Sequence, residues 1–377
     1  MADMGADVIK IEPPGGDTTR NMRTRAGRPA VADHSFQALN RGKRSITVDL
    51  VQPGAADVVL RIAEDADVFV TNLMTVRLER YGLTYESVRA RDKAIVFAQI
   101  TGWGSQGVGA TRPGFDSTSY WAGSGLMGLM GEVDTPAVVS RGGQGDYPAG
   151  LTLLTAILAA LRVRDQTGES QFVDATLQRV GLWSMASESQ QVLNNPAYHA
   201  QRYDRMQADL ATRNSYLTSD GRWMMLTMHN IDYWKRFCAA LDRPDWAADP
   251  QYVSPELMPQ NQTDLIPEID ELFRAHDLAY WAKRLDESGC VWALAATIEE
   301  VTTDPELRSQ GTFHKIPDVD EEGHSVEVVT IPFTIAGAEM QPRRRAPGLG
   351  EHSQEVLLQA GFSEEQIGQI ASDGILG

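Results

Sequence analysis

Residues 6–16 read ADVIKIEPPGG, a short run of β-branched residues that ends at two prolines and two glycines. Val and Ile favour strands, and Pro and Gly favour turns, so this stretch predicts a strand that opens an α/β fold. Further strands are predicted in the same third of the chain, at 44–50, 66–71 and 94–101. Segments 54–65 and 85–92 predict helices between them. Alternating strands and helices indicate βαβ units and a parallel sheet.

Glycine becomes dense between residues 102 and 150, and an apolar segment follows it. Glycines permit unusual backbone angles and let a ligand approach the main chain closely. Segment 148–164 carries Leu and Ile at helical spacing and is followed by Gly168, so it predicts a long core helix. A strand at 170–177 and a helix at 182–193 are predicted after it.

A second region starts near Asn214. Stretches 215–218 and 222–228 flank Ser219-Asp220-Gly221, a turn sequence typical of a β-hairpin. Later elements are predicted as helices at 233–241 and 265–288, a β run at 325–335, and tail helices at 351–360 and 363–371. We therefore predict a large domain of residues 1–195 and 330–377, a small α+β domain of residues 214–323, and linkers at 196–213 and 324–329.

Composition excludes several classes of function. The net charge of −17 disfavours nucleic acid as a partner, because phosphate backbones need basic surfaces. No stretch reaches the roughly 20 apolar residues that span a bilayer, and no secretory signal is visible. Cys238 and Cys290 lack metal-ligand spacing and fit a reducing compartment. We predict a cytoplasmic protein with no bound metal, no membrane association and no nucleic-acid partner.

One segment is basic on this acidic chain. Between Thr18 and Arg44 a single acid, Asp33, stands among seven basic residues: Arg20, Arg23, Arg25, Arg28, Arg41, Lys43 and Arg44. Two interpretations stay open, a solvated surface loop or a site for a polyphosphate ligand.

Asp146 lies in residues 143–150, GQGDYPAG, directly before the apolar helix. Asp is a favoured N-cap and Pro suits the first helical turn, so a purely structural role is one interpretation. The other is a nucleophile. A helix N-terminus stabilises the carboxylate anion, which could attack an acyl carbonyl, and flanking glycine N–H groups could stabilise an oxyanion. The local sequence fits both.

Other catalytic patterns are absent from the sequence. It contains no Gly-x-Ser-x-Gly elbow, no Gly-x-Gly-x-x-Gly that follows a strand and opens a helix, and no P-loop. A nucleotide ligand would therefore have to bind in some other way.

Several motifs, in order, resemble class III CoA-transferases, the formyl-CoA and carnitine CoA-transferase family (CaiB/BaiF type). The similarity runs from Gly5 to the C-terminus, and several matches in the right order are more specific than any one. The matching segments are 5–17 (GADVIKIEPPGGD), 40–46 (NRGKRSI), 67–72 (DVFVTN), 80–85 (RYGLTY), 158–161 (LAAL), 167–171 (TGESQ) and 346–352 (APGLGEH).

The resemblance implies a Rossmann-like large domain completed by the C-terminal segment, a smaller domain, and an interlocked homodimer. It implies that Asp146 carries the acyl group as an anhydride and then CoA as a thioester. Acyl-CoA and a carboxylic acid would be the substrates, with no permanently bound cofactor. By the same resemblance, CoA would contact Val48, Asn72, Leu73, Arg80 and Tyr81, and its phosphates would attract the basic segment.

The chain also departs from the family pattern. The strand and helix expected before the first motif are missing, together with a loop that lines the thioester site. Segment 208–214 contains no glycine where formyl-CoA transferases have a glycine-rich flap, and Thr101 replaces a basic CoA-contacting position. We therefore do not expect formyl-CoA/oxalate specificity.

Two alternatives to a transferase are open. An α-methylacyl-CoA racemase needs a base on each face of its substrate, and the racemase branch has Gly-His-Asp where this chain has Gly114-Phe115-Asp116. Phe115 cannot take a proton, which favours the transferase. A non-catalytic CoA-binding homologue is the other alternative. Aromatic and Met residues of the glycine-rich region could line an acyl pocket or simply pack in the core: Trp103, Tyr120, Trp121, Met127, Met130 and Tyr147.

Overall fold

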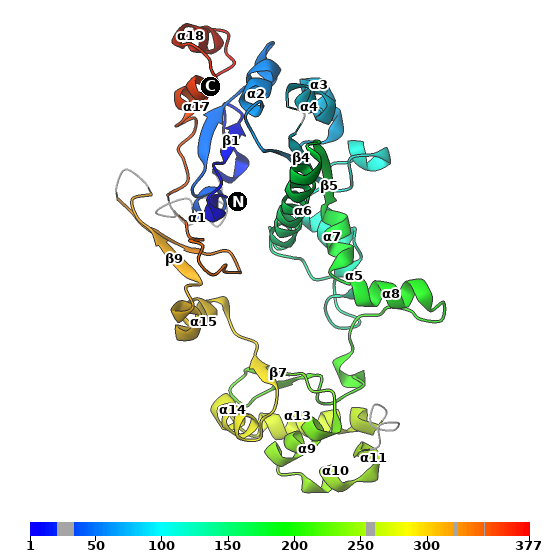
Figure 1. Ribbon diagram of the computed structural model, residues 1–377. Coiled ribbons are helices and arrows are strands. Elements are labelled where there is room, and N and C mark those ends of the chain that lie inside the picture. Colours follow the sequence, from blue (N-terminus) through cyan, green and yellow to red (C-terminus); the bar gives the residue numbers. More distant parts are fainter. Residues whose placement is uncertain (21–33, 93, 254–260, 320–322, 343) are drawn as a thin grey trace. The chain divides into compact units, whose positions relative to one another are not determined.

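The computed structural model describes residues 1–20, 34–92, 94–253, 261–319, 323–342 and 344–377 (Figure 1). Contacts divide the chain into two compact units, which we describe separately. The larger unit comprises Met1–Leu126, Ser140–Ser189 and Asp304–Gly377, and the smaller comprises Met127–Val139 and Gln190–Thr303. Parallel and antiparallel sheets both occur, so the fold is mixed α/β.

The larger unit contains a parallel sheet in the order β3-β4-β5. Its strands are β3 (Val68–Thr71), β4 (Val96–Thr101) and β5 (Gln171–Thr176). The long helix α6 (Asp146–Thr167) connects β4 to β5 and packs against both strands (Figure 1). Near its C-terminal end, Arg164 pairs with Asp67 at 2.8 Å, just before β3 begins. The N-terminus of α6 therefore lies at the carboxyl edge of the sheet.

Strands β1 (Ile9–Glu12) and β2 (Arg44–Thr47) form a second parallel pair in this unit. The end of the chain packs on them, because the Asp49 N–H donates to the Ile375 carbonyl at 2.8 Å. The surrounding helices are α2 (Ala55–Ala63), α3 (Thr75–Tyr81), α4 (Tyr85–Arg91), α17 (Ser353–Gln359) and α18 (Glu364–Ser372). One apolar core joins these segments and includes Ile46, Val59, Phe97, Val356, Leu357 and Ile370.

An antiparallel hairpin of β9 (Phe313–Ile316) and β10 (Val326–Val329) also belongs to the larger unit. Helix α1 (His34–Asn40) packs against β10. This differs from the predicted boundaries, which assign 304–323 to the small domain and 324–329 to a linker. The pairing of β9 with β10 and the packing of α1 on β10 keep these strands in the larger unit. Whether the two units fold as independent domains stays a prediction.

The smaller unit is built on the antiparallel sheet β6-β7-β8, and the predicted hairpin is its first strand pair. The strands are β6 (Ser215–Leu217), β7 (Trp223–Leu226) and β8 (Trp292–Leu294). Aromatic rings fill the core, with Phe273 stacked on Trp281 at 4.5 Å and on Tyr216 at 4.9 Å between centroids. Its longer helices are α8 (Ala186–Asn194), which begins in the larger unit, α9 (Ile231–Ala240), α13 (Ile266–Arg274) and α14 (Leu278–Glu287).

Several predicted elements differ from the observed ones in extent. The helix predicted at 265–288 is two helices, because the Asp277 side chain accepts the Tyr280 N–H at 2.9 Å and starts α14. The helix predicted at 182–193 is divided between α7 (Leu177–Trp183) and α8. The β run predicted at 325–335 is regular only in β10. Shorter helices absent from the prediction include α5 (Leu126–Leu129), α10 (Pro244–Ala248), α11 (Pro250–Val253), α15 (Ile298–Thr303) and α16 (Pro305–Ser309).

Candidate active site

The loops at the carboxyl edge of the β3-β4-β5 sheet are joined by hydrogen bonds. The Gln99 side chain of β4 donates to the Leu73 carbonyl at 2.9 Å, beyond the end of β3. After β5, the Gln178 N–H donates to the Gly102 carbonyl at 3.2 Å. Ligands of parallel α/β sheets bind outside the carboxyl ends of the strands. This edge is therefore the natural place for a site.

Asp146 is the first residue of α6, and Gly145 is the N-cap. The interpretation of Asp146 as an N-cap is therefore wrong: no side-chain cap hydrogen bond is made at this helix start. Asp146 lies at the surface, and its carboxyl group is partly desolvated. A side chain that does not cap its own helix is available to a substrate.

A second carboxylate, Asp116, supports the loop before Asp146. It begins the short π-helical turn η4 (Asp116–Ala122) and is 6% exposed. Its two oxygens accept the backbone N–H of Gly143 at 2.7 Å and of Gly145 at 3.0 Å. These two N–H groups therefore bind Asp116, which corrects the expectation that they stabilise an oxyanion.

The loop requires glycine at position 145. A Cβ there would lie 2.3 Å from the Asp116 carboxylate and 2.3 Å from the Tyr120 ring. Gly143 has φ of +87°, a left-handed conformation that other residues rarely adopt. The glycine density of the sequence thus has a local cause, the close packing of this loop on a buried carboxylate.

The pKa of Asp146 is raised above its usual value, first by partial burial and second by the negative charge of Asp116. This differs from the expectation from the helix N-terminus, which favours the anion. A raised pKa makes the carboxylate more basic. Perturbed carboxyl groups of this kind are common at catalytic sites.

The five residues expected to contact CoA have different environments. Val48 is 1% exposed and its N–H donates to the Glu12 carbonyl, so its side chain cannot touch a ligand. Leu73 and Tyr81 are half-buried against the same core as Val48. Asn72 and Arg80 are exposed, and the Arg80 guanidinium lies 5.9 Å from the centre of the Tyr81 ring.

The described part of the basic segment is largely neutralised. Arg20 pairs with Glu12 at 2.7 Å, Arg41 with Asp3 at 2.7 Å, and Arg44 with Asp7 and Glu355. Burial, with a smaller effect of nearby Lys10, lowers the pKa of Lys43 to about 8. Arg23, Arg25 and Arg28 lie outside the described residues. The ion pairs give the three described arginines a structural role, which argues against their binding polyphosphate.

Comparison with known proteins decides the family. The model of CoA-transferase family III matches residues 1–353. The chain belongs to CoA-transferase family III. It is 27% identical over 380 residues to the (R)-2-hydroxy-4-methylpentanoate CoA-transferase of Clostridioides difficile, covering 100% of this chain and 94% of that protein. It is 30% identical over 372 residues to the succinate–glutarate CoA-transferase of Agrobacterium fabrum, covering 95% and 90%.

A solved structure of the same family agrees with the fold. A CaiB/BaiF family protein from Brucella suis is 27% identical, with a TM-score of 0.79 over 95% of this chain and 93% of that one. The resemblance read from the sequence motifs is thereby confirmed. The family III chain is a CoA-transferase, which uses CoA thioesters as substrates.

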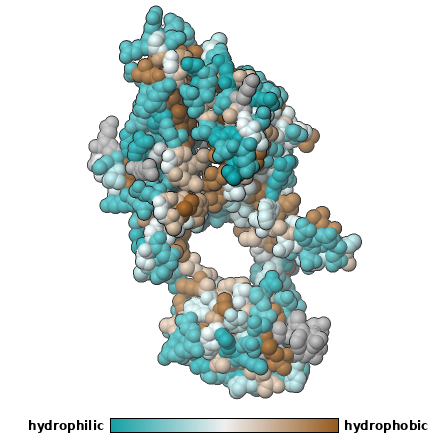
Figure 2. Space-filling view, in the orientation of Figure 1, coloured by the Kyte–Doolittle hydropathy of each residue, from teal (hydrophilic) through white to brown (hydrophobic). Residues whose placement is uncertain are grey.

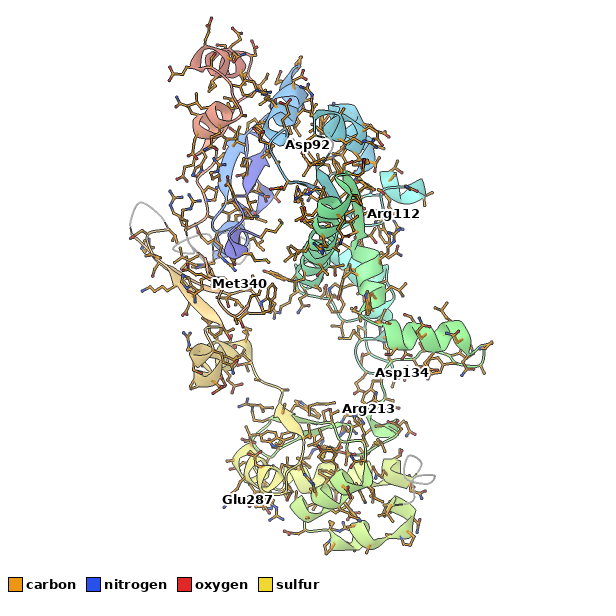
Figure 3. The ribbon with its side chains drawn as sticks, in the orientation of Figure 1. Asp92, Arg112, Asp134, Arg213, Glu287 and Met340 are labelled. Carbon is orange, nitrogen blue, oxygen red and sulfur yellow. The ribbon has the colours of Figure 1, made fainter. Side chains whose placement is uncertain are left out.

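Aromatic residues of the glycine-rich region fall into two groups in this family III chain. Tyr120 is buried beside Ala149 of α6, and Arg112 lies over the Trp103 ring at 3.5 Å from its centre (Figure 3 labels Arg112). Phe115 is 76% exposed and Tyr147 is 61% exposed. These two residues adjoin Asp116 and Asp146 in sequence, and their rings are exposed. Met127 and Met130 belong to the smaller unit.

Within the described ranges, no group of three or more His, Cys, Asp or Glu side chains could hold a metal ion. By length and composition alone, α6 could cross a membrane, but it packs Leu153 and Ile157 in a core with Ala98 and Ala175 of the sheet.

Sequence reasoning missed Asp116. Of the Gly114-Phe115-Asp116 motif, only Phe115 enters the sequence argument, as evidence against a racemase. Its aspartate, which lies within the glycine-dense region and upstream of the loop that leads to Asp146, is the available signal. The partners of Asp116 lie 27 and 29 residues away, so the sequence alone could not reveal the contact.

Proposed function

We propose that this family III chain transfers CoA from an acyl-CoA to a carboxylic acid, with Asp146 as the nucleophile. The observation that supports it best is the placement of Asp146. Asp146 lies at the surface, makes no cap hydrogen bond, and follows a loop fixed by Asp116. A carboxylate nucleophile is a known means of covalent catalysis.

The proposed reaction proceeds by carboxylate and thiolate exchange, without net proton transfer. An Asp146 oxygen attacks the donor thioester carbonyl; the C–S bond breaks, and CoA leaves as the thiolate. The thiolate attacks the aspartyl carbonyl of the mixed anhydride, and the donor acid leaves as its carboxylate. An acceptor carboxylate then attacks the aspartyl-CoA thioester and expels the thiolate. The thiolate attacks the acceptor acyl carbon, which yields the new acyl-CoA and restores Asp146.

For CoA itself, we assign contacts to the five residues at the ends of β2 and β3 and in α3. Val48 offers only its main chain, because its side chain is buried. Asn72 and Arg80 offer exposed polar groups, and Leu73 and Tyr81 offer partly exposed apolar surface. Arg80 supplies a positive charge for a CoA phosphate.

The proposal extends to an interlocked homodimer with a Rossmann-like large domain, located in the cytoplasm. Within the described residues, α6 buries only Ala149, Leu153, Ile157 and Ala160. Leu151, Leu158 and Val163 are exposed on it, and hydrophobic surface is open beside α6 in Figure 2. Such an apolar surface is typical of a protein interface, and a second copy of the chain would cover it. Anhydride and thioester intermediates need exclusion of water, which this cover would also supply.

The relatives suggest classes of acid that this chain could use as substrates, but no single acid. Relatives include a cinnamoyl-CoA:phenyllactate CoA-transferase of Clostridium sporogenes, 28% identical over 382 residues and covering 99% of this chain and 91% of that protein. The exposed Phe115 and Tyr147 rings favour an acid with an apolar side chain over a small dicarboxylate.

An exchange assay in D2O tests the function. The purified protein is incubated with 2-hydroxyacyl-, cinnamoyl- and succinyl-CoA donors, each against a panel of carboxylic acids, and products are identified by mass spectrometry. We expect a new acyl-CoA without deuterium at its α-carbon. Deuterium incorporation at the α-carbon without transfer of CoA between acids would instead demonstrate racemase chemistry. CoA binding with neither deuterium incorporation nor CoA transfer would demonstrate a non-catalytic protein.

A further inference from the structure

The geometry points to Asp116 as the positioning residue that sets where the Asp146 carboxylate stands in the proposed reaction. This inference rests on the proposed function of Asp146. Asp116 does not touch substrate; it acts through the backbone of the loop that leads into α6.

Asp116 is held rigidly at the carboxyl edge of the sheet. Its element, η4, packs against α7, which follows β5 directly. The Gln178 side chain of α7 donates to the Gly123 carbonyl at the end of η4, at 2.8 Å. Gly181 lies so close that a Cβ there would be 2.4 Å from the Tyr120 carbonyl oxygen. The position of Asp116 is therefore tied to the sheet.

Asp116 accepts hydrogen bonds from two backbone N–H groups of the glycine loop, two residues apart. One oxygen accepts Gly145 N–H, and the other accepts Gly143 N–H. Gly145 is the residue before Asp146, so its placement fixes where the nucleophile begins. Each N–H donates to a charged carboxylate, and such hydrogen bonds are about twice as strong as those between neutral groups. A neutral residue at 116 would loosen this loop.

The same carboxylate affects the chemistry of Asp146. Among the described charged groups, Asp116 is the one that acts on the pKa of Asp146, and it raises that pKa. A more basic carboxylate is a stronger nucleophile, so one residue both places and activates Asp146.

The test is the rate at which Asp146 acquires an acyl or CoA adduct, measured against pH with acyl-CoA. Asp116→Asn keeps the size of the side chain but removes its charge and turns an NH2 group toward an N–H donor. We expect adduct formation to slow by about 10²-fold, which is typical for a misplaced reacting group. We also expect the acidic limb of the rate profile to move to lower pH, because the repulsion between the charges of residues 116 and 146 is lost. The affinity for free CoA should not change.

Asp304→Asn is the matched control. Asp304 also accepts a backbone N–H, from Leu307 at 2.9 Å, but at the start of α16. It should leave the adduct rate and the pH profile unchanged. Gly145→Ala is the second variant, should Asp116→Asn fail to fold: its Cβ displaces the loop while Asp116 keeps its charge, so the rate should fall with little movement of the limb.

The two failures are distinguishable. Wild-type protein that exchanges CoA without any adduct on Asp146 would overturn the proposed function. Wild-type protein that forms the adduct, with Asp116→Asn or Gly145→Ala forming it at the same rate and with the same acidic limb, would overturn only the role of Asp116.

Discussion

Two parts of the larger unit differ in how their carboxylates are paired. Around β1 and β2, carboxylates meet arginines: Glu12 accepts two hydrogen bonds from Arg20, each 2.7 Å, and one from Ser45. At the N-terminus of α6, Asp116 and Asp146 lie near each other, and within the described residues neither forms an ion pair. Ion pairs stabilise the fold, whereas a carboxylate perturbs the pKa of a neighbouring carboxylate, as is common at catalytic sites. The difference separates the structural acids of this chain from its chemical ones.

Replacing the nucleophile should have the largest effect. Asp146→Asn preserves volume but cannot form an anhydride, so CoA exchange should fall by at least about 10³-fold. The thermal midpoint should stay within a few degrees, because Asp146 is exposed and makes no cap bond. Asp165→Asn, at the other end of α6 in an exposed pair with Arg164, is the control and should retain wild-type exchange. If Asp146→Asn exchanges CoA at the wild-type rate, the carboxylate at the N-terminus of α6 is no more catalytic than the paired acids around β1 and β2.

Breaking a pair in the β1–β2 region should reduce stability instead of activity. Arg20→Met leaves Glu12, 1% exposed, without its cation. The expected loss is about 3 kcal/mol in the free energy of unfolding, measured with urea. Arg91→Met, which breaks exposed pairs with Asp57 and Glu64, should cost less than about 1 kcal/mol. Equal losses in both variants would mean that burial does not distinguish these pairs.

The acid dependence of the same pair has a definite sign. The pKa of Glu12 is lowered in the folded state: burial opposes this, and hydrogen bonds from Arg20 and Ser45 outweigh it. Its contribution to stability is therefore present above the unfolded pKa and lost as pH falls through the folded one. Arg20→Met should lose that acid-dependent contribution.

Lys43 should show the smallest effect, with a slope of the same sign as that of Glu12 but in the alkaline range. Its pKa of about 8 lies below the ordinary lysine value, so between these values the unfolded chain binds more protons. Stability should therefore rise with pH, by about 1 kcal/mol between pH 8 and 9 relative to Lys43→Met. Matched curves for the two proteins would show that Lys43 is not buried in solution.

The elements of the parallel sheet could be predicted from sequence because β-branched runs there are bounded by clear turns. β3 and β4 fall within the segments predicted at 66–71 and 94–101. The break between α13 and α14 could not, because Asp277 sits inside a continuous helical pattern and its capping role depends on the local backbone. Sequence patterns locate elements better than they locate interruptions.

The site was predictable to a similar degree. Asp146 stands out because glycines precede it and an apolar helix follows, and the family motifs assign it a role. The burial of Val48 could not be predicted, because a valine in the sequence is compatible both with a core and with a ligand contact. Nor did the ion pairs of the basic segment, whose acids lie up to 311 residues away, as for Arg44 and Glu355. Long-range partners decide what a charge does.

Direct detection of the covalent intermediate tests the central claim most sharply. Protein mixed with labelled acyl-CoA is trapped with hydroxylamine or borohydride, digested, and analysed by mass spectrometry. We predict that modification falls on the peptide containing Asp146, at that residue, and disappears in Asp146→Asn. Rapid CoA exchange with an unmodified Asp146 peptide would contradict the account.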